Sequence, residues 1–267
     1  CILGLDQVTA DTVSASGNMN MKLTKCGLAS NSNSGSASMY ENGSAAITAD
    51  YVHLAGALDQ KNGTLSSSNI VSNGPRVGDP YRDVSTPTTN GGSQVDPSLH
   101  GQQNATLNPG TYPSMTLGSQ GTATLNSGVY VINGGQLTIN SGQTVTGSNV
   151  TFVLQNNATV RINGGATVNI SAPTSGPNKG IAFYQVPGSD TTVTQQFNGG
   201  SSMNITGALY FPNQTVSFNG GNASGGTCTH VVARIITING NSDTNLDCTG
   251  ADPSNNPPMF EIPYLVE

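Results

Sequence analysis

The sequence has no tryptophan, few aromatic residues and very little charge, and these absences exclude several classes of protein. Only 8% of its 267 residues are charged and 5% are aromatic. The eight Lys and Arg residues are scattered and the net charge is −6, whereas proteins that bind nucleic acid need clustered basic side chains. No apolar run approaches the roughly 18 residues of a membrane span. The composition, 34% apolar and rich in Gly, Ser, Thr and Asn, fits neither a typical soluble enzyme nor an acidic disordered tail.

Signatures of catalysis and of phosphate binding are missing too. The sequence has no G-x-S-x-G motif, and His53, His100 and His230 lie far apart, so we expect lone surface or edge histidines rather than a catalytic triad. The repeated Asn-Gly-Gly units lack the Lys and the following helix of a P-loop. No cysteine pair has the C-x-x-C spacing of a metal knuckle. The sequence therefore predicts no catalytic residue, no cofactor and no metal.

What the sequence does contain is a repeat of short alternating runs of Val, Ile and Thr, each ending at a corner with Asn and Gly. Such runs, for example 137–139, 160–162, 216–218 and 236–238, are typical of short strands. The corners recur about once per solenoid coil. At each corner Gly allows a positive φ, and Asn amides of successive coils can bond in a ladder. The predicted structural corners are Asn140, Asn163, Asn198, Asn219 and Asn239.

This pattern predicts an all-β fold: a single-stranded right-handed parallel β-helix, or β-solenoid, forming one domain over residues 1–267. We expect N-terminal coils over 1–72 and main coils over 104–248. Between them, residues 73–103 are dense in Pro and Gly and predict a long surface loop. Residues 249–267 contain prolines that block ladder bonding and predict a non-repetitive tail that caps the last coil.

Alternation also predicts which side chains form the core. Residues i and i+2 of a strand share a face, so one set of apolar residues should point inward in stacked rows. This set is Ile139, Ile162, Val168, Ile170, Ile205, Val216, Phe218 and Ile238. Tyr130, Tyr184 and Tyr210 end apolar runs and are expected in the core; an outward row would instead favour a sugar-binding platform.

The four cysteines fall into two local pairs, Cys1 with Cys26 and Cys228 with Cys248. We predict that both pairs are disulfides of an exported protein and that they fasten the two ends of the solenoid. Crossed pairs would join the first coil to the last, which a long rod should hold too far apart. The chain opens on Cys1 without an initiator Met, so we expect a processed or excised segment with an export signal or anchor upstream.

Two groups of charged residues are candidates for chemistry. The first comprises Arg76, Asp79, Arg82 and Asp83; we interpret it as an Arg–Asp pair that pins the long loop to the solenoid, the alternative being the carboxylate site of a carbohydrate-active enzyme. The second comprises Asp243, Asp247 and Asp252 around Cys248, where a weak Ca²⁺ site is the alternative to a plain loop.

Several stretches resemble a known family: "CILGLD", "KCGLASNSNS", "ISAPTSGPNKGIAFYQ", "GALYFPNQTVSFNGG" and the closing "PYLVE". Together they are similar to the carboxy-terminal region of bacterial TadG-like proteins of the Flp/Tad pilus assembly system. Ala172 to Pro177 and Ala208 to Asn213 carry the most specific part of the resemblance. Family members usually have a membrane segment upstream, and often extra cysteines in the central loop that this sequence lacks. The resemblance implies a cell-envelope or surface protein linked to adhesion.

Our leading hypothesis is a non-catalytic structural or adhesive β-solenoid, exported to the bacterial cell surface, whose partners are Tad/Flp pilus components or a surface ligand. A carbohydrate-active enzyme and a self-assembling extracellular fibre, whose coils stack through uncovered edge strands, are the alternatives. We expect no nucleic-acid partner and no membrane segment within this chain.

Overall fold

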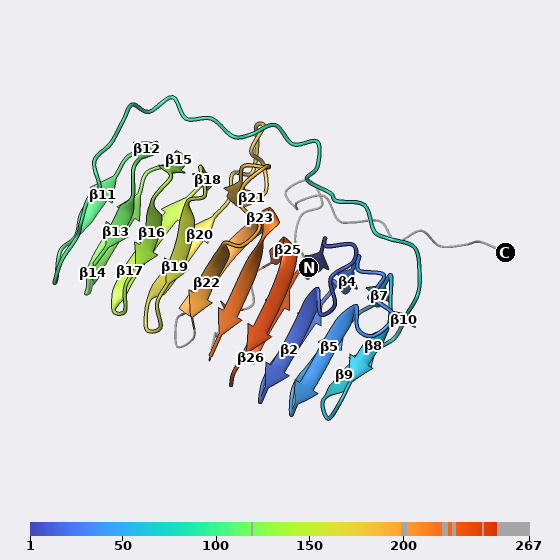
Figure 1. The fold of residues 1–267 in the computed structure, drawn as a ribbon. Coiled ribbons are helices and arrows are strands. Elements are labelled where there is room, and N and C mark those ends of the chain that lie inside the picture. The colour runs from blue at the N-terminus through green and yellow to red at the C-terminus, as the bar shows by residue number, and fades with distance from the viewer. Residues whose placement is uncertain (119, 199–201, 221–223, 226–227, 242, 250–267) are drawn as a thin grey trace.

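A computed structural model describes residues 1–118, 120–198, 202–220, 224–225, 228–241 and 243–249, and within these ranges every regular element is a β-strand. The strands stack in parallel into an elongated body (Figure 1). None of the described residues forms a helix that could cross a membrane. The predicted tail (249–267) and Asp252 lie outside the described residues apart from Thr249. The expected all-β fold with large parallel sheets is therefore confirmed.

Each coil passes in turn through three faces, and strands of the same face in adjacent coils of the stack pair in parallel. Face 1 contains β12 (Gly110–Tyr112), β15 (Gly128–Asn133), β18 (Val150–Gln155), β21 (Ile181–Gln185), the middle of β23 (Ser202–Asn219), the start of β25 (Thr229–Asn239), β1 (Ile2–Gly4), β4 (Leu28–Ser30), β7 (Val52–Leu54) and β10 (Ile70–Val71).

Face 2 follows directly along the chain. It contains β13 (Met115–Leu117), β16 (Gln136–Ile139), β19 (Thr159–Ile162), β22 (Thr194–Asn198), the ends of β23 and β25, β2 (Val13–Gly17), β5 (Met39–Gly43) and β8 (Leu58–Gln60).

Face 3 closes the coil. It contains β11 (Ala105–Leu107), β14 (Gly121–Leu125), β17 (Gln143–Ser148), β20 (Thr167–Ser171) and the start of β23, and separately β24 (Ser224–Gly225), β26 (Asp243–Asp247), β3 (Asn20–Thr24), β6 (Ala46–Ala49) and β9 (Thr64–Ser67).

Alternation along each strand separates the core from the surface, because neighbouring side chains point to opposite faces of a sheet. In β19, for example, Val160 and Ile162 are buried while Arg161 between them is exposed. All the apolar residues predicted to point inward are buried except Phe218, which is half-buried and packs against the core. Aromatic rings from successive coils stack in this core, from Tyr130 through Phe152 to Phe183, with centroids 5.5 and 5.1 Å apart. Tyr130 thus lies in the core, as predicted.

The order of the coils in space differs from their order in the sequence. The first coil lies in the middle of the stack, where β1 pairs with β25, β2 with β25 and β3 with β26 (Figure 1). We call this junction between the last and the first described coils the seam. Beyond it, the N-terminal coils run outward to β10, while the main coils begin at the far end with β11 and return to the seam. The expectation that the first and last coils occupy opposite ends is therefore wrong.

The crossing segment, residues 72–104, makes this arrangement possible by running from one end of the stack to the other (Figure 1). It contains no strand, only one isolated bridge between Ser93 and Thr111. Over its first part it covers the outer side of face 1, where Val77 and Tyr81 complete a second apolar cluster with residues such as Val153, Tyr184 and Tyr210. The outer side of face 1 is consequently buried, which explains its nearly continuous apolar strands.

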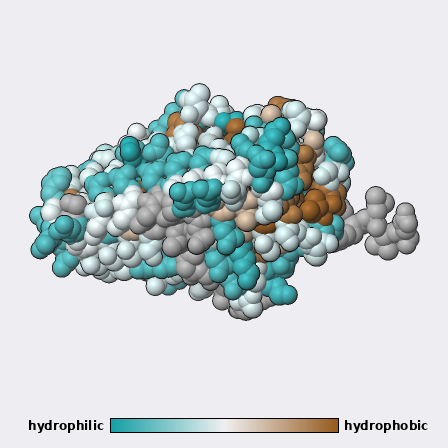
Figure 2. All heavy atoms as spheres, turned by 90° about the horizontal axis from the view of Figure 1, so that it is seen from below, coloured by the Kyte–Doolittle hydropathy of each residue, from teal (hydrophilic) through white to brown (hydrophobic). Residues whose placement is uncertain are grey.

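The edge strands at the two ends of the stack are covered to different extents. At the main-coil end, the crossing segment covers the edge: Gln94 N donates to Thr111 O, and Leu99 N donates to Thr116 O. Asp96 there accepts hydrogen bonds from both the main-chain N–H and the hydroxyl of Thr116. At the other end, Ile70 is 42% exposed. Figure 2 shows a mainly hydrophilic surface, with a hydrophobic area toward the side of the N-terminal coils.

The Asn corners stack as hydrogen-bonded pairs. Asn163 Nδ2 donates to Asn140 Oδ1 at 3.0 Å, and Asn219 Nδ2 donates to Asn198 Oδ1 at 3.3 Å. At the seam the column continues with a different residue, since Asn239 Oδ1 accepts a hydrogen bond from the Ser16 hydroxyl at 2.6 Å. These contacts fit the predicted structural role of the corners.

Beside the Asn column runs a column of glycines that crosses the seam. Gly220, Gly240, Gly17 and Gly43 have φ of +80°, +118°, +99° and +80°, a region that L side chains avoid. A Cβ on Gly17 would lie 2.6 Å from the carbonyl oxygen of Gly240, so the two coils approach too closely for a side chain. The same corner geometry therefore continues from the main coils into the N-terminal coils.

Candidate functional site at the seam

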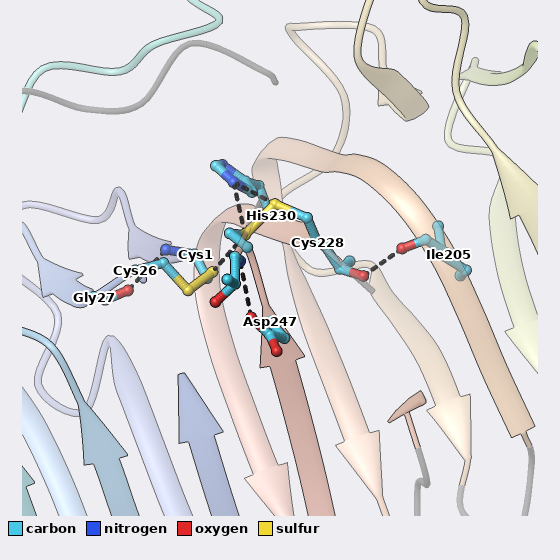
Figure 3. The surroundings of a disulfide bond; sticks show 10 residues. Cys1, Cys26, Gly27, Ile205, Cys228, His230 and Asp247 are labelled. Atoms are coloured by element: carbon cyan, nitrogen blue, oxygen red, sulfur yellow. Dashed lines mark hydrogen bonds between the residues drawn. A yellow bond between two sulfur atoms is a disulfide. The ribbon is translucent and has the colours of Figure 1, made fainter. Parts of the chain in front are cut away.

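All four cysteines lie at the seam, where they form the disulfides Cys1–Cys26 and Cys228–Cys248. The predicted pairs are thus the bonded pairs, but the predicted reason was wrong. Cys1 Sγ and Cys248 Sγ are only 3.6 Å apart, so distance does not exclude a crossed pair (Figure 3). Nor do the disulfides fasten the ends of the stack. Each disulfide instead joins the start of one coil to the end of the same coil. One of these coils lies on each side of the seam.

His230 completes this cluster of sulfur atoms. Its Nε2 lies 3.5 Å from Cys228 Sγ and 3.7 Å from Cys248 Sγ (Figure 3). Burial lowers the pKa of His230 to about 3, so the ring is neutral at physiological pH. The donor atoms of Cys228, His230 and Cys248 are close enough together to hold a metal ion, but with both disulfides formed these sulfurs are not thiolates, and thiolate is the form in which cysteine ligates a metal. In the disulfide form the cluster is therefore a packed junction.

An ion pair and main-chain hydrogen bonds join the two sides of the seam at the turn from face 1 to face 2. Arg234 Nη1 lies 3.0 Å from Asp6 Oδ2, and both side chains are largely buried. Two main-chain bonds lie beside it, from Leu5 N to Ala233 O and from Asp6 N to Arg234 O. Arg234 also donates to Asn213 O and Thr191 O, which fixes its guanidinium group. Nothing in the sequence spacing signals this pairing.

The crossing segment bridges the seam on the outside. On the N-terminal side, the main chain of Val77 makes two hydrogen bonds with the side-chain amide of Asn31, both 2.8 Å long. On the main-coil side, the ring of Tyr81 lies 5.2 Å from that of Tyr210, and the Tyr210 hydroxyl donates to Asp79 Oδ2 at 2.9 Å. The crossing segment therefore holds both blocks of coils at once.

The first predicted charged group lies on this part of the crossing segment, but it forms no Arg–Asp pair in the part of the chain that the structure describes. Arg76 donates to the carbonyl oxygens of Asn31 and Gln7, at 3.1 and 3.0 Å. The described ion pairs are Lys61–Asp59 and Arg234–Asp6. The loop is pinned, as expected, but by hydrogen bonds and ring contacts.

Three members of this group line an open hollow of about 350 Å³: Arg76, Asp79 and Arg82. Its other walls come from Leu5, Gln7, Asn31, Val77, Gly78 and Pro212, so both blocks contribute to it. Asp83 is exposed and does not line the hollow. The convergence of Asp79, Asp83 and Arg76 that a carbohydrate-active site would need is thus incomplete.

Tyr184 and Tyr210 point away from the core, contrary to expectation. Both belong to the apolar cluster between face 1 and the crossing segment, where their rings lie 5.4 Å apart. Each is 2% exposed, because Tyr81 and Val84 of the crossing segment cover them. Burial, together with the charge of Asp79, raises the pKa of Tyr210 well above its usual range. An outward row exists, but it offers no free aromatic surface for a sugar.

The remaining predicted residues lie apart from the hollow. His53 and His230 are buried rather than at the surface, and His53 Nε2 lies 2.6 Å from Pro75 O, where the crossing segment leaves β10. His100 is exposed, as expected. Hydrogen bonds from the Thr249 side chain and from its main-chain N–H lower the pKa of Asp247. Asp243 lies in β26, so the second charged group shows no convergent carboxylates among the residues whose side chains are described.

One surface feature was missed by the sequence reasoning, although the alternation could have revealed it. The outer side of face 3 over the main coils carries rows of hydroxyl and amide side chains, aligned by the strand register, and no charged residue in its strands. We call this surface the hydroxyl face. Its rows are Thr122, Thr144 and Thr167; Thr106, Thr124, Thr146, Asn169 and Asn204; and Ser148, Ser171 and Thr206.

Comparisons of the chain with protein-family models, with curated proteins and with solved structures found no match.

Proposed function

We propose that this chain is a non-catalytic adhesive β-solenoid of the bacterial cell surface, the carboxy-terminal region of a TadG-like protein of the Tad/Flp pilus system. We also propose that its single strand winds in a right-handed sense. Two disulfides fit an oxidising compartment, which supports export. The family assignment rests on the sequence stretches that resemble TadG-like proteins.

The hydroxyl face is the observation that carries the adhesive role. Neighbouring coils place equivalent side chains about 4.8 Å apart, so the rows form a regular and uncharged lattice of hydrogen-bonding groups. Such a lattice suits a ligand that is itself extended and polar, because many weak hydrogen bonds can form together. It offers no charge that would attract a nucleic acid or an anionic membrane.

Two features weigh against the alternatives. For an enzyme, Asp79 would need a free carboxylate, but its two oxygens accept hydrogen bonds from Tyr81 N and the Tyr210 hydroxyl. For a fibre, both ends of the stack would need open edges, but residues 92–103 cover the main-coil end. We therefore expect monomers in light scattering at high concentration and no turnover of pectin or chitin oligomers.

The adhesive role is tested by placing charge on the hydroxyl face. We expect the double variant Thr124→Glu, Thr146→Glu to lose roughly tenfold in retention on a hydroxylated surface such as cellulose, measured with a quartz-crystal microbalance. Thr138→Glu, on an outward position of face 2, is the matched control and should bind like the wild type. Equal retention of all three proteins, at equal melting temperature, would remove the hydroxyl face as the adhesive surface.

The pilus association needs a separate test. A Tad secretion cluster beside this gene, and loss of surface attachment when the gene is deleted from a strain that assembles the pilus, are the expected results. A neighbourhood of sugar-utilisation genes and unchanged attachment would contradict the association.

A further inference from the structure

The hollow beside the seam gathers two of the eight basic residues of an acidic chain. It is bounded by the crossing segment on one side and by the turns that follow face 1 on the other, through Leu5, Asn31 and Pro212. Its volume of about 350 Å³ falls within the usual range for small-molecule sites, which begins at about 300 Å³. The hollow is thus large enough for a sugar ring.

Its two arginines differ in how they are held. Arg76 is fixed, because its Nε donates to Asn31 O and its Nη2 to Gln7 O. That leaves Nη1 without a hydrogen bond within the described chain. The guanidinium group of Arg82 is exposed and makes no hydrogen bond or ion pair to any described residue. One preorganised and one adjustable guanidinium group therefore share the same hollow.

The carboxylate of Asp79 does not cancel this positive charge. Its Oδ1 accepts the main-chain N–H of Tyr81, and its Oδ2 accepts the Tyr210 hydroxyl. The charged residues that line the hollow, two guanidinium groups and one carboxylate, have a net charge of +1. Asp83, which does not line the hollow, lies close enough to act on the Tyr210 hydroxyl. Planar guanidinium groups bind carboxylates with paired, charge-assisted hydrogen bonds, which makes a carboxylate the matching ligand group.

The uncharged lining indicates what the carboxylate should be attached to. Leu5, Val77 and Pro212 provide apolar surface, while Gln7 and Gly78 add polar groups to the lining. A sugar ring presents C–H groups on its faces and hydroxyls on its edges, and so complements such a lining. We infer that the hollow binds a hexuronic acid residue of an acidic polysaccharide, with the carboxylate on Arg76 and Arg82. This site does not depend on adhesion through the hydroxyl face.

The experiment measures binding of trigalacturonic acid to the whole chain by isothermal titration calorimetry at low salt. The expected result is saturable binding that weakens with added salt, and no binding of the neutral trisaccharide of galactose. Arg82→Gln should weaken the affinity roughly 10- to 100-fold, the loss expected for a charge-assisted bidentate contact. Arg161→Gln is the matched control, because Arg161 is exposed on face 2, away from the hollow, and should change the affinity less than twofold.

Arg76→Gln should also weaken binding, but it removes two hydrogen bonds of the crossing segment, so its melting temperature is measured alongside. If that variant unfolds, Arg82→Gln alone decides the matter. Three results would overturn the inference: no saturable binding of the acidic trisaccharide, equal binding of the neutral one, or an Arg82→Gln affinity equal to that of Arg161→Gln. Competition by inorganic phosphate as strong as that by galacturonate would point to a general anion site and would also overturn it.

Discussion

Arg234 and Asp6, at opposite ends of the described chain, form an ion pair in which Nη1 and Oδ2 are 3.0 Å apart. The pair lies at the seam, where two blocks of coils meet without a covalent connection between adjacent strands. Burial by itself would raise the pKa of Asp6, but hydrogen bonds from Thr9, Val8 and Arg234 outweigh it, and the pKa is lowered. The pair therefore contributes stability above the ordinary pKa of Asp, and loses it as the pH falls through the lowered value.

The first prediction concerns this pair. Arg234→Gln should destabilise the fold by about 1–3 kcal/mol, because it breaks the ion pair and removes hydrogen bonds to the carbonyl oxygens of Asn213 and Thr191. Urea unfolding monitored by circular dichroism gives the free energy, and Arg161→Gln serves as the exposed control. Indistinguishable stabilities of the two variants would refute an energetic role for Arg234 at the seam.

The glycine column provides a second prediction. Gly17→Ala should cost at least about 2 kcal/mol, since a methyl group at φ +99° is strained and would also clash with the carbonyl oxygen of Gly240. Gly35→Ala is the control: no atom lies within 4 Å of the added methyl group, and we expect a change within about 1 kcal/mol. An unchanged stability of the Gly17→Ala variant would mean that the coils on the two sides of the seam lie farther apart than the contact with Gly240 implies.

The disulfides provide the third prediction. An unreduced digest analysed by mass spectrometry should yield peptides linked as Cys1–Cys26 and Cys228–Cys248. Replacing Cys228 and Cys248 together by Ser should lower stability by roughly 3 kcal/mol, the chain-entropy value for a loop of this length. A peptide linking Cys1 to Cys248 would show that the neighbouring sulfurs, 3.6 Å apart, pair across the seam instead.

Glu41 gives a prediction about pH. Its carboxyl group is buried in β5, which pairs with β8 in the N-terminal coils, and burial raises its pKa, with only partial opposition from the N–H of Thr64. The folded chain therefore holds a proton that the unfolded chain releases, so stability falls as the pH rises from about 4.5 through the raised pKa. Glu41→Gln removes this loss and should raise the melting temperature at pH 7 but not at pH 4. An equal effect at both pH values would show that titration of Glu41 is not the cause.

The face assignment is tested within a single strand. Ile162→Asp should unfold the domain, because it would bury an unpaired charge at a position with 0% exposure. Arg161→Asp, the exposed neighbour, should leave the fold intact. If the Ile162→Asp variant keeps the β signal in far-ultraviolet circular dichroism, the assignment of inward and outward faces in β19 is wrong.

Local patterns in the sequence were enough to predict the coil. Alternation in runs such as 160–162 predicted short strands and assigned their inward residues, and the Asn-Gly corners predicted turns that need positive φ, as at Gly220 and Gly240. The local grouping of the cysteines predicted the pairs Cys1–Cys26 and Cys228–Cys248, although the argument that distance excludes a crossed pair was wrong. These features depend on neighbours in the chain or one coil away, so a single sequence contains them.

Tertiary structure alone decided which coil lies against which. Every coil presents the same unpaired main-chain groups at its edge, so no residue pattern distinguishes the partner of the first coil from any other. Only the assembled stack, with residues 72–104 crossing it, brings Asp6 to Arg234 and Cys1 to Cys248. It also buries Tyr184 and Tyr210 on the outside of face 1, and forms a hollow between Arg76 and Pro212, residues whose proximity depends on where a strandless segment lies.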